Sequence, residues 1–415
     1  LHTTAQDIEL LSQRVTGKSL EPKVVEIVRN IKSADVKGTF GGRLSSFRTA
    51  GNVVTPVGRL SADVEMRSVQ TERYALRGIV DTDNLQLGEL LSINSLGGLT
   101  SSIAMDGSVG AGGVVADLSV NVGSIGVGAN RFNNITAQGA IDHDTYVAEV
   151  HSYDKNLSFD LNSIIDLGAY IPSYEVMLKL NRADLNALGI NKRDSLSVVS
   201  LEMGVDVDGR KLDDMNGSIS VVNMRYEYPD GELLSDRLSA EIRGYDERKD
   251  ISIKSDFADI DFQSRATYKQ IANYIFNALK RYVPLLYDGD TAQEVVANDS
   301  ISAYDYSMFT MQTHESLNDL LAAILGDFLV APDTDLAMVF SPQNNHLSVQ
   351  LGSEAIEYKG VILADAELDI KNEQDSLLMW INSEAIYLGS RKIMPNFNLS
   401  ATAHQNRVNL SADFK

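Results

Sequence analysis

Strict alternation of apolar and polar residues is the dominant pattern along this chain. Residues 58–67 place apolar side chains at every second position, at Leu60, Ala62, Val64 and Met66. Because successive side chains of a β-strand point to opposite faces, this segment is expected to be a strand with one apolar and one polar face. The same alternation predicts strands in residues 364–371, 397–401 and 408–414.

Turn-forming residues separate these segments. Asp208-Gly209, Asp230-Gly231 and the polar run 372–375 each lie between two alternating stretches. Such pairs favour tight hairpins, so the strands are expected to form an antiparallel sheet in which chain neighbours pair.

Four segments carry a helical pattern. Residues 5–15 and 22–32 are predicted to be short helices, the second with Pro22 in its first turn, where proline is tolerated. Residues 271–282 and 317–328 repeat apolar residues at helical spacing and are each followed by a proline. Each of the latter two is expected to be an amphipathic helix that packs on the sheet as a plug or lid.

A weak internal repeat organises the middle of the chain. Residues 74–85 and 174–185, about 100 residues apart, share their end residues and their alternation, and residues 306–317 have the same end residues. Residues 152–159 and 255–262 form a second similar pair. A repeat built of hairpins predicts units that stack along one axis.

Composition excludes several classes of protein. The chain has 415 residues, a formal net charge of -21 and no cysteine. Without cysteine there is no disulfide framework, thiolate zinc site or iron–sulfur cluster. The acidic composition argues against a nucleic-acid partner, because negative charges repel phosphate groups. No apolar stretch approaches the roughly 20 residues of a membrane-spanning helix. Because residue 1 is leucine and not an initiator methionine, a processed or excised piece of a longer chain is expected.

The sequence contains no pattern typical of an enzyme or of a cofactor or metal site. The six histidines have no paired metal-ligand spacing, and no Gly-x-Ser-x-Gly motif is present. Residues 81–84 and 333–335 are rich in Asp but lack the terminal Glu of a calcium loop, so they are interpreted as turns. The glycines of residues 107–128 lie in strand-like sequence with no helix after them, which favours bends or bulges over a phosphate loop.

The apolar face of such a sheet must be covered or used. Two sheets could close on each other as a sandwich, or one sheet could curl into a groove that holds an apolar ligand. The 11 methionines and the single tryptophan favour the groove. The predicted fold class is therefore mostly β, an elongated, curled antiparallel sheet with a few short amphipathic helices. The predicted regions are short N-terminal helices in 1–33 and repeated groove units in 34–266, with repeats that start near residues 74 and 174. Helical insertions that act as a plug, with a short strand, are predicted in 267–330, and further groove strands in 331–415.

Three segments resemble the TamB family, the translocation and assembly module subunits of the AsmA-like group. They are residues 34–66, residues 174–190 with Asp184-Leu185-Asn186-Ala187-Leu188-Gly189, and the stretch from Ser255-Asp256-Phe257-Ala258-Asp259 through 284. The resemblance is one of pattern, extends over most of the chain, and contains no diagnostic motif.

The resemblance implies a periplasmic location in a Gram-negative bacterium, with an inner-membrane anchor outside this sequence. It implies a β-taco groove that conducts phospholipid acyl chains between the inner and outer membranes, and an Omp85-type outer-membrane barrel as a partner of the full-length protein. An outer-membrane protein or autotransporter assembly scaffold, or an adhesin-like structural protein, is the alternative. A carbohydrate-active β-helix enzyme is disfavoured by the low aromatic content.

The only site predicted is the apolar face itself. No catalytic residue, cofactor or metal ligand is expected. The candidate lipid-binding groove residues are Leu60, Ala62, Val64, Met66, Leu76, Val176, Leu178, Leu180, Leu368 and Ile370. The competing interpretation of these residues is that they fill a closed core.

Overall fold

The structure is a computed structural model of the whole chain. It describes residues 2–7, 9–10, 22–43, 45–70, 73–110, 112–245, 248–271, 306–325, 327–341, 346–373, 376–404 and 407–413. The chain divides into two compact units, unit 1 with residues 1–204 and 226–229, and unit 2 with residues 205–225 and 230–415. Each unit is described by itself.

The prediction of a mostly β chain with an antiparallel sheet and a few short helices is confirmed. The described residues form 24 strands of one sheet, and the sheet is not closed on itself. The described residues contain no helix with the length and apolar character needed to cross a membrane.

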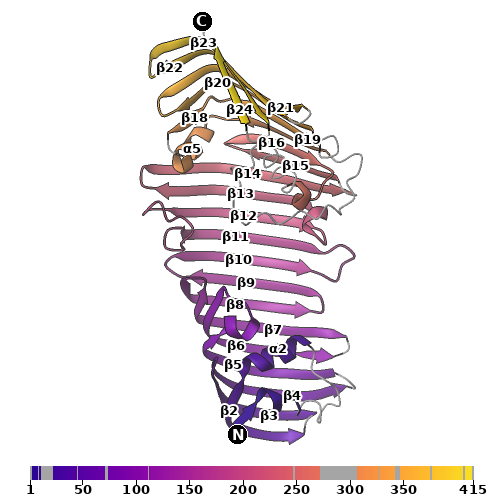
Figure 1. Cartoon of the computed structure of the whole chain (residues 1–415). Coiled ribbons are helices and arrows are strands. Elements are labelled where there is room, and N and C mark those ends of the chain that lie inside the picture. The colour runs from indigo at the N-terminus through magenta and orange to yellow at the C-terminus, as the bar shows by residue number, and fades with distance from the viewer. Residues whose placement is uncertain are drawn as a thin grey trace. The chain divides into compact units, whose positions relative to one another are not determined.

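Unit 1 is a meander of antiparallel strands that follow one another in chain order (Figure 1). Each strand pairs with its neighbours in the chain, as the hairpin signals predicted. The strands are β1 (His2–Thr4), β2 (Ser33–Arg43), β3 (Ser46–Thr55), β4 (Gly58–Gln70), β5 (Arg73–Gln86), β6 (Leu96–Gly110), β7 (Gly113–Val127), β8 (Asn130–Asp142), β9 (Thr145–Tyr153), β10 (Leu157–Asp166) and β11 (Ser173–Asp184).

Unit 2 repeats the antiparallel arrangement with one irregularity. Its strands also pair in chain order, except that β18 lies beside β20 and β17 pairs directly with β19. The strands are β14 (Gly231–Tyr245), β15 (Arg248–Ser255), β16 (Ala258–Ser264), β17 (Ser307–Thr313), β18 (Phe328–Val330), β19 (Asp335–Ser341), β20 (His346–Tyr358), β21 (Val361–Glu373), β22 (Ser376–Leu388), β23 (Arg391–His404) and β24 (Arg407–Asp413). Strands β12 (Val198–Asp208) and β13 (Asn216–Tyr228) contain residues of both units.

The helices agree only in part with the sequence pattern. Helix α2 (Pro22–Ile31) is confirmed, whereas α5 (Leu317–Leu325) ends earlier than predicted, because Phe328 begins β18 and pairs with Tyr358. Of the predicted helix 5–15, residues 5–7 and 9–10 are helical and the rest lies outside the described residues. Of the predicted helix 271–282, only its first residue is described. Helix α3 (Leu87–Leu91) and the short 3-10 helix η1 (Leu212–Asp214) were not predicted.

Helix α2 packs on α3 at one end of the strands of unit 1. The side-chain amide of Asn30 donates to the carbonyl oxygen of Leu90 (3.0 Å) and to Ser92 Oγ (3.2 Å), and Ser92 Oγ donates to Glu26 Oε1 (2.9 Å). In unit 2, α5 packs on β18, and Asn318 Oδ1 accepts a hydrogen bond from the backbone N–H of Val330 (2.9 Å). Helix α5 therefore lies against the sheet, whereas α2 lies against α3.

Bulges interrupt the ladders where the sequence suggested turns or bends. The register of β5 and β6 shifts between Thr82 and Leu85, and Asn84 has a φ of 47°. The interpretation of residues 81–84 as a turn is therefore wrong, because Asn84 adopts the left-handed conformation inside a continuing strand. The glycine prediction is confirmed at Gly123, which lies at the register shift between β6 and β7.

Candidate functional site

The strand register brings eight of the ten predicted groove residues to one face of unit 1. Residues directly opposite in an antiparallel pair lie on the same face, so the pairings can be followed from strand to strand. Followed from Ala62 on β4, they reach Leu178 on β11 through an unbroken line of apolar residues. This line, row 1, is Ala62, Val80, Ile103, Val120, Ala137, Val150, Leu161 and Leu178.

Three parallel rows contain the other predicted residues of unit 1. Row 2 is Val64, Gly78, Met105, Leu118, Gly139, Ala148, Ser163 and Val176; row 3 is Leu60, Thr82, Ser101, Val122, Ile135, Ser152, Phe159 and Leu180; and row 4 is Met66, Leu76, Gly107, Ala116, Ile141, Tyr146, Ile165 and Tyr174. The two copies of the sequence repeat, on β5 and β11, thus contribute residues to the same rows.

Unit 2 has an apolar face of its own, which includes the two remaining predicted residues. Ile370 belongs to row 5 and Leu368 to row 6, and both rows cross ten strands without a polar residue. Row 5 is Ile242, Ile251, Phe262, Phe309, Met338, Val349, Ile370, Met379, Ala401 and Leu410; row 6 is Ala240, Ile253, Ile260, Met311, Leu336, Leu351, Leu368, Ile381, Leu399 and Ala412.

All ten predicted residues are half-buried. Residues at the centre of a closed sandwich core would be buried, whereas the buried apolar residues here are elsewhere and mostly small, such as Ala366 and Ala385. Apolar side chains that project from the opposite face are more exposed, with Ile79 at 49% and Met177 at 65%. The apolar side chains of the rows are therefore only partly shielded from solvent.

A hollow of unit 1 lies on the opposite, charged face, where the sequence predicted none. It measures about 920 Å³ and extends over strands β3–β9. Its charged lining residues are Arg48, Asp63, Glu65, Arg77, Asp106, Asp117 and Glu149. Small side chains such as those of Ala104, Ser119 and Ala140 form part of its floor, so the long charged side chains stand higher than their surroundings.

Ion pairs neutralise part of this hollow. The guanidinium of Arg48 donates two hydrogen bonds to the carboxylate of Asp63 (3.1 and 2.9 Å). These bonds raise the pKa of Arg48 and lower the pKa of Asp63. Arg77 Nε lies 3.3 Å from Asp106 Oδ2. Asp106 is also directly opposite Asp117 on β7, so two like charges face each other across the strand pair.

A histidine with two carboxylate partners lies on the same charged face. His151 Nδ1 is 2.6 Å from Asp160 Oδ1, and its Nε2 is 3.0 Å from Glu149 Oε1. These hydrogen bonds raise the pKa of His151, and the bond to Asp160 has the larger effect. The side-chain amide of Asn181 donates to the second carboxylate oxygen of Asp160 (3.1 Å). Among the described residues, no three His, Asp or Glu side chains gather in a way that could hold a metal ion.

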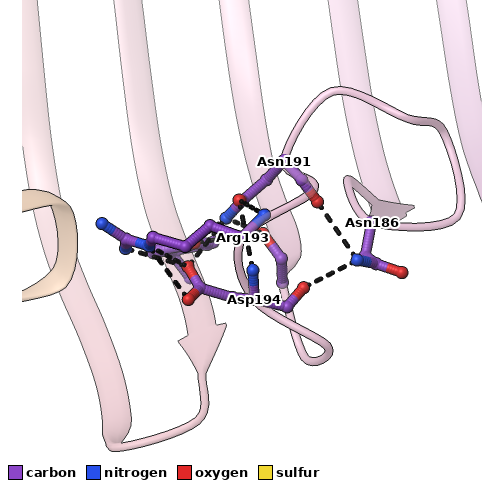
Figure 2. Close-up of polar contacts among 6 residues, drawn as sticks. Asn186, Asn191, Arg193 and Asp194 are labelled. Carbon is purple, nitrogen blue, oxygen red and sulfur yellow. Dashed lines mark hydrogen bonds and ion pairs between the residues drawn. The ribbon is translucent and has the colours of Figure 1, made fainter.

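A polar network stiffens the loop that follows β11, residues 185–197. Figure 2 shows the side chain of Asn186 directed at the backbone carbonyls of Asn191 (3.2 Å) and Asp194 (2.8 Å). Asn191 donates to Asp194 Oδ2 (2.9 Å), and the guanidinium of Arg193 pairs with the same carboxylate (2.9 Å). The hydrogen bonds from Arg193 and Asn191 lower the pKa of Asp194. This loop is thus a fixed polar structure at one end of the strands.

The alternation of the sequence was sufficient to find which residues share a face within each strand. The hollow on the charged face was not predicted from the sequence, because it depends on which strands are adjacent and on their register. The only available signal was the excess of small residues at alternate positions of residues 104–140.

Comparison with known proteins does not extend this description. No family model, no curated protein and no solved structure matches the chain. A proposal for its function therefore depends on the geometry of its two faces.

Proposed function

We propose that the apolar rows bind phospholipid acyl chains and that the protein is a segment of a TamB-like lipid conduit between two membranes. The observation that carries this proposal is the unbroken row 1, in which eight apolar residues from eight consecutive strands line one half-buried face. At about 4.8 Å between strands, such a row is on the order of 35 Å long. That length is comparable to the hydrocarbon thickness of a bilayer, about 30 Å.

The chemistry of the rows is suited to a flexible hydrocarbon. Rows 5 and 6 combine leucine and isoleucine with methionine, and the flexible methionine side chain adapts to irregular apolar ligands. They contain no charged residue, so an acyl chain lying along them would meet no unpaired charge. The charged opposite face keeps such a sheet in water while its apolar face is occupied. A periplasmic location, an inner-membrane anchor outside this sequence and an Omp85-type barrel partner are parts of the same proposal.

Photocrosslinking from neighbouring positions tests the proposal. Val120 belongs to row 1, whereas Ser119, the preceding residue, lines the hollow on the charged face. A benzophenone amino acid at position 120 is expected to crosslink to co-purified phospholipid, detected by mass spectrometry of the intact protein. The same group at position 119 is the matched control and should give little lipid adduct. Equal labelling at both positions, or none at position 120, would contradict an acyl-chain groove.

The alternative of an assembly scaffold for outer-membrane proteins has support in one observation. The charged hollow over β3–β9 is a polar surface that a protein partner could occupy. In that case the group at position 119, and not the group at position 120, would form the dominant adduct, and its mass would be that of a polypeptide.

A further inference from the structure

The connection between β10 and β11 has an unusual composition for a loop. Residues 167–172 are Leu-Gly-Ala-Tyr-Ile-Pro and contain no charged residue. Three large side chains project from it, with Leu167 exposed by 47%, Tyr170 by 88% and Ile171 by 51%. Exposed connections are usually polar, and contiguous exposed apolar side chains typically mark an interaction surface. Residues 167–172 are called the apolar loop below.

The base of the apolar loop is fixed to its neighbours. The backbone N–H of Leu167 donates to the carbonyl oxygen of Asp144 (2.9 Å), which extends the β9–β10 ladder by one step. Asp166 Oδ1 accepts from the backbone N–H groups of Gly168 (2.9 Å) and Ala169 (3.2 Å). The sheet therefore holds the loop at its start, and Tyr170 and Ile171 follow these two bonds in the chain.

The apolar loop joins two strands that contribute residues to the apolar face of unit 1. Row 4 ends at Tyr146, Ile165 and Tyr174, and the loop connects the strands that carry Ile165 and Tyr174. Tyr146 is itself 39% exposed. An acyl chain lying on row 4 would consequently reach the loop without crossing a charged residue of that row.

We propose that the apolar loop inserts into the interfacial region of a phospholipid bilayer and is the point at which acyl chains enter the rows of unit 1. The second half of this inference rests on the proposed function, and the first half does not. Tyrosine with leucine and isoleucine is a combination suited to that region, because the ring lies among apolar groups while its hydroxyl stays hydrated.

The size and the charge of the site favour a bilayer over a protein partner. Three projecting side chains cover far less than the roughly 800 Å² that each partner contributes to a stable protein interface. Three carboxylates, those of Asp142, Asp144 and Asp166, lie at the same strand ends. They would repel anionic headgroups, so a surface of zwitterionic lipid is the one that fits.

Flotation of the full chain with phosphatidylcholine vesicles tests the bilayer contact. The wild-type chain is expected to float with the vesicles, and the triple variant Leu167→Ser, Tyr170→Ser, Ile171→Ser is expected to bind at least about tenfold more weakly. Ile190→Ser is the matched control. It removes an isoleucine that is 71% exposed from the loop 185–197, which lies at the other end of β11, and should leave binding unchanged. Vesicles rich in phosphatidylglycerol should bind less wild-type protein than phosphatidylcholine vesicles do.

A spectroscopic readout keeps the test independent of folding defects. In the variant Tyr170→Trp, the emission of the introduced tryptophan is obtained by subtracting the spectrum of the wild-type chain, which contains only Trp380. This emission should shift to shorter wavelength when phosphatidylcholine vesicles are added. An absent shift, a wild-type chain that does not float, or a triple variant that floats as well as the wild type would overturn the inference.

The two parts of the inference fail in distinguishable ways. Lipid supplied in detergent micelles should still crosslink at position 120 in the triple variant, because the rows themselves are intact. If flotation depends on the loop but no lipid crosslinks at position 120, the proposed bilayer contact is supported and the proposed acyl groove is contradicted. If lipid crosslinks at position 120 but flotation does not depend on the loop, the proposed acyl groove is supported and the proposal that the loop is its entrance is contradicted.

Discussion

The side chain of Lys249 is almost completely buried, and its Nζ lies 3.1 Å from Asp213 Oδ1. Lys249 also donates to the carbonyl oxygen of Ala266 (3.0 Å), and the same carboxylate oxygen accepts from the backbone N–H of Tyr268 (2.9 Å). This ion pair therefore connects η1, β15 and the segment after β16 within unit 2.

Removing the carboxylate of this pair should destabilise unit 2 strongly. Asp213→Asn leaves the buried ammonium of Lys249 without its counter-ion, at an expected cost of about 3 kcal/mol in the free energy of unfolding. Lys249→Met should cost less, because Asp213 is 37% exposed and can be hydrated. Urea unfolding of both variants measures the difference, and a larger loss for Lys249→Met would contradict the interpretation.

Charged substitutions on the apolar rows should abolish lipid binding beyond their effect on folding. We expect Val64→Asp and Leu368→Arg to reduce the co-purified phospholipid per chain at least about tenfold, because a charge on the row would have to lose its hydration against an acyl chain. Asp63→Ser, one residue away on the charged face, is the control. A folded Val64→Asp variant that retains its lipid would count against the groove.

Protonation of His151 should stabilise unit 1 at low pH. Its pKa is raised in the folded protein by Asp160 and Glu149, so its contribution is fully present below the ordinary value of about 6.5 and is lost as pH rises through the folded-state pKa. Asp160→Asn should move the imidazole titration, followed by NMR, to lower pH. A titration unaffected by that substitution would show that Asp160 does not set the pKa.

One glycine of row 2 is required by the close approach of two strands. A Cβ on Gly78 would meet the backbone oxygen of Asp63 and the Cα of Val64, whereas a Cβ on Gly41 would meet no atom within 4 Å. Gly78→Ala is therefore expected to lower the free energy of unfolding by about 1–3 kcal/mol. Gly41→Ala should be nearly neutral, and similar effects of the two substitutions in thermal unfolding would contradict this difference.

The parts of the fold that depend on the local pattern of apolar and polar residues could be predicted from the sequence. The alternation at Leu60 to Met66 predicted both the strand and its faces, and Pro22 with the residues after it predicted α2. The pattern failed where pairing overrides local preference, as at Phe328, which continues the helical spacing yet joins a ladder with Tyr358. Helix α3 has five residues, too few for a periodic signal.

Features that depend on register were not accessible in the same way. No local pattern in the sequence predicts that Asp106 lies opposite Asp117, because this pairing depends on the register of β6 and β7. That Ala62 and Leu178 are the two ends of the same row depends on the registers of all the strands between them. The candidate residues were therefore identified as apolar positions of single strands, and the rows that join them emerge only from the pairings.

The chain-order meander of unit 1 has a consequence for how the sheet is assembled. Because each strand from β3 to β10 pairs only with the strands before and after it in the chain, no ladder there requires distant sequence to close a long loop. Each hairpin can therefore form from a short stretch of sequence. The edge of the part of the sheet already formed is a template for the next strand, with energetics set by neighbouring hairpins.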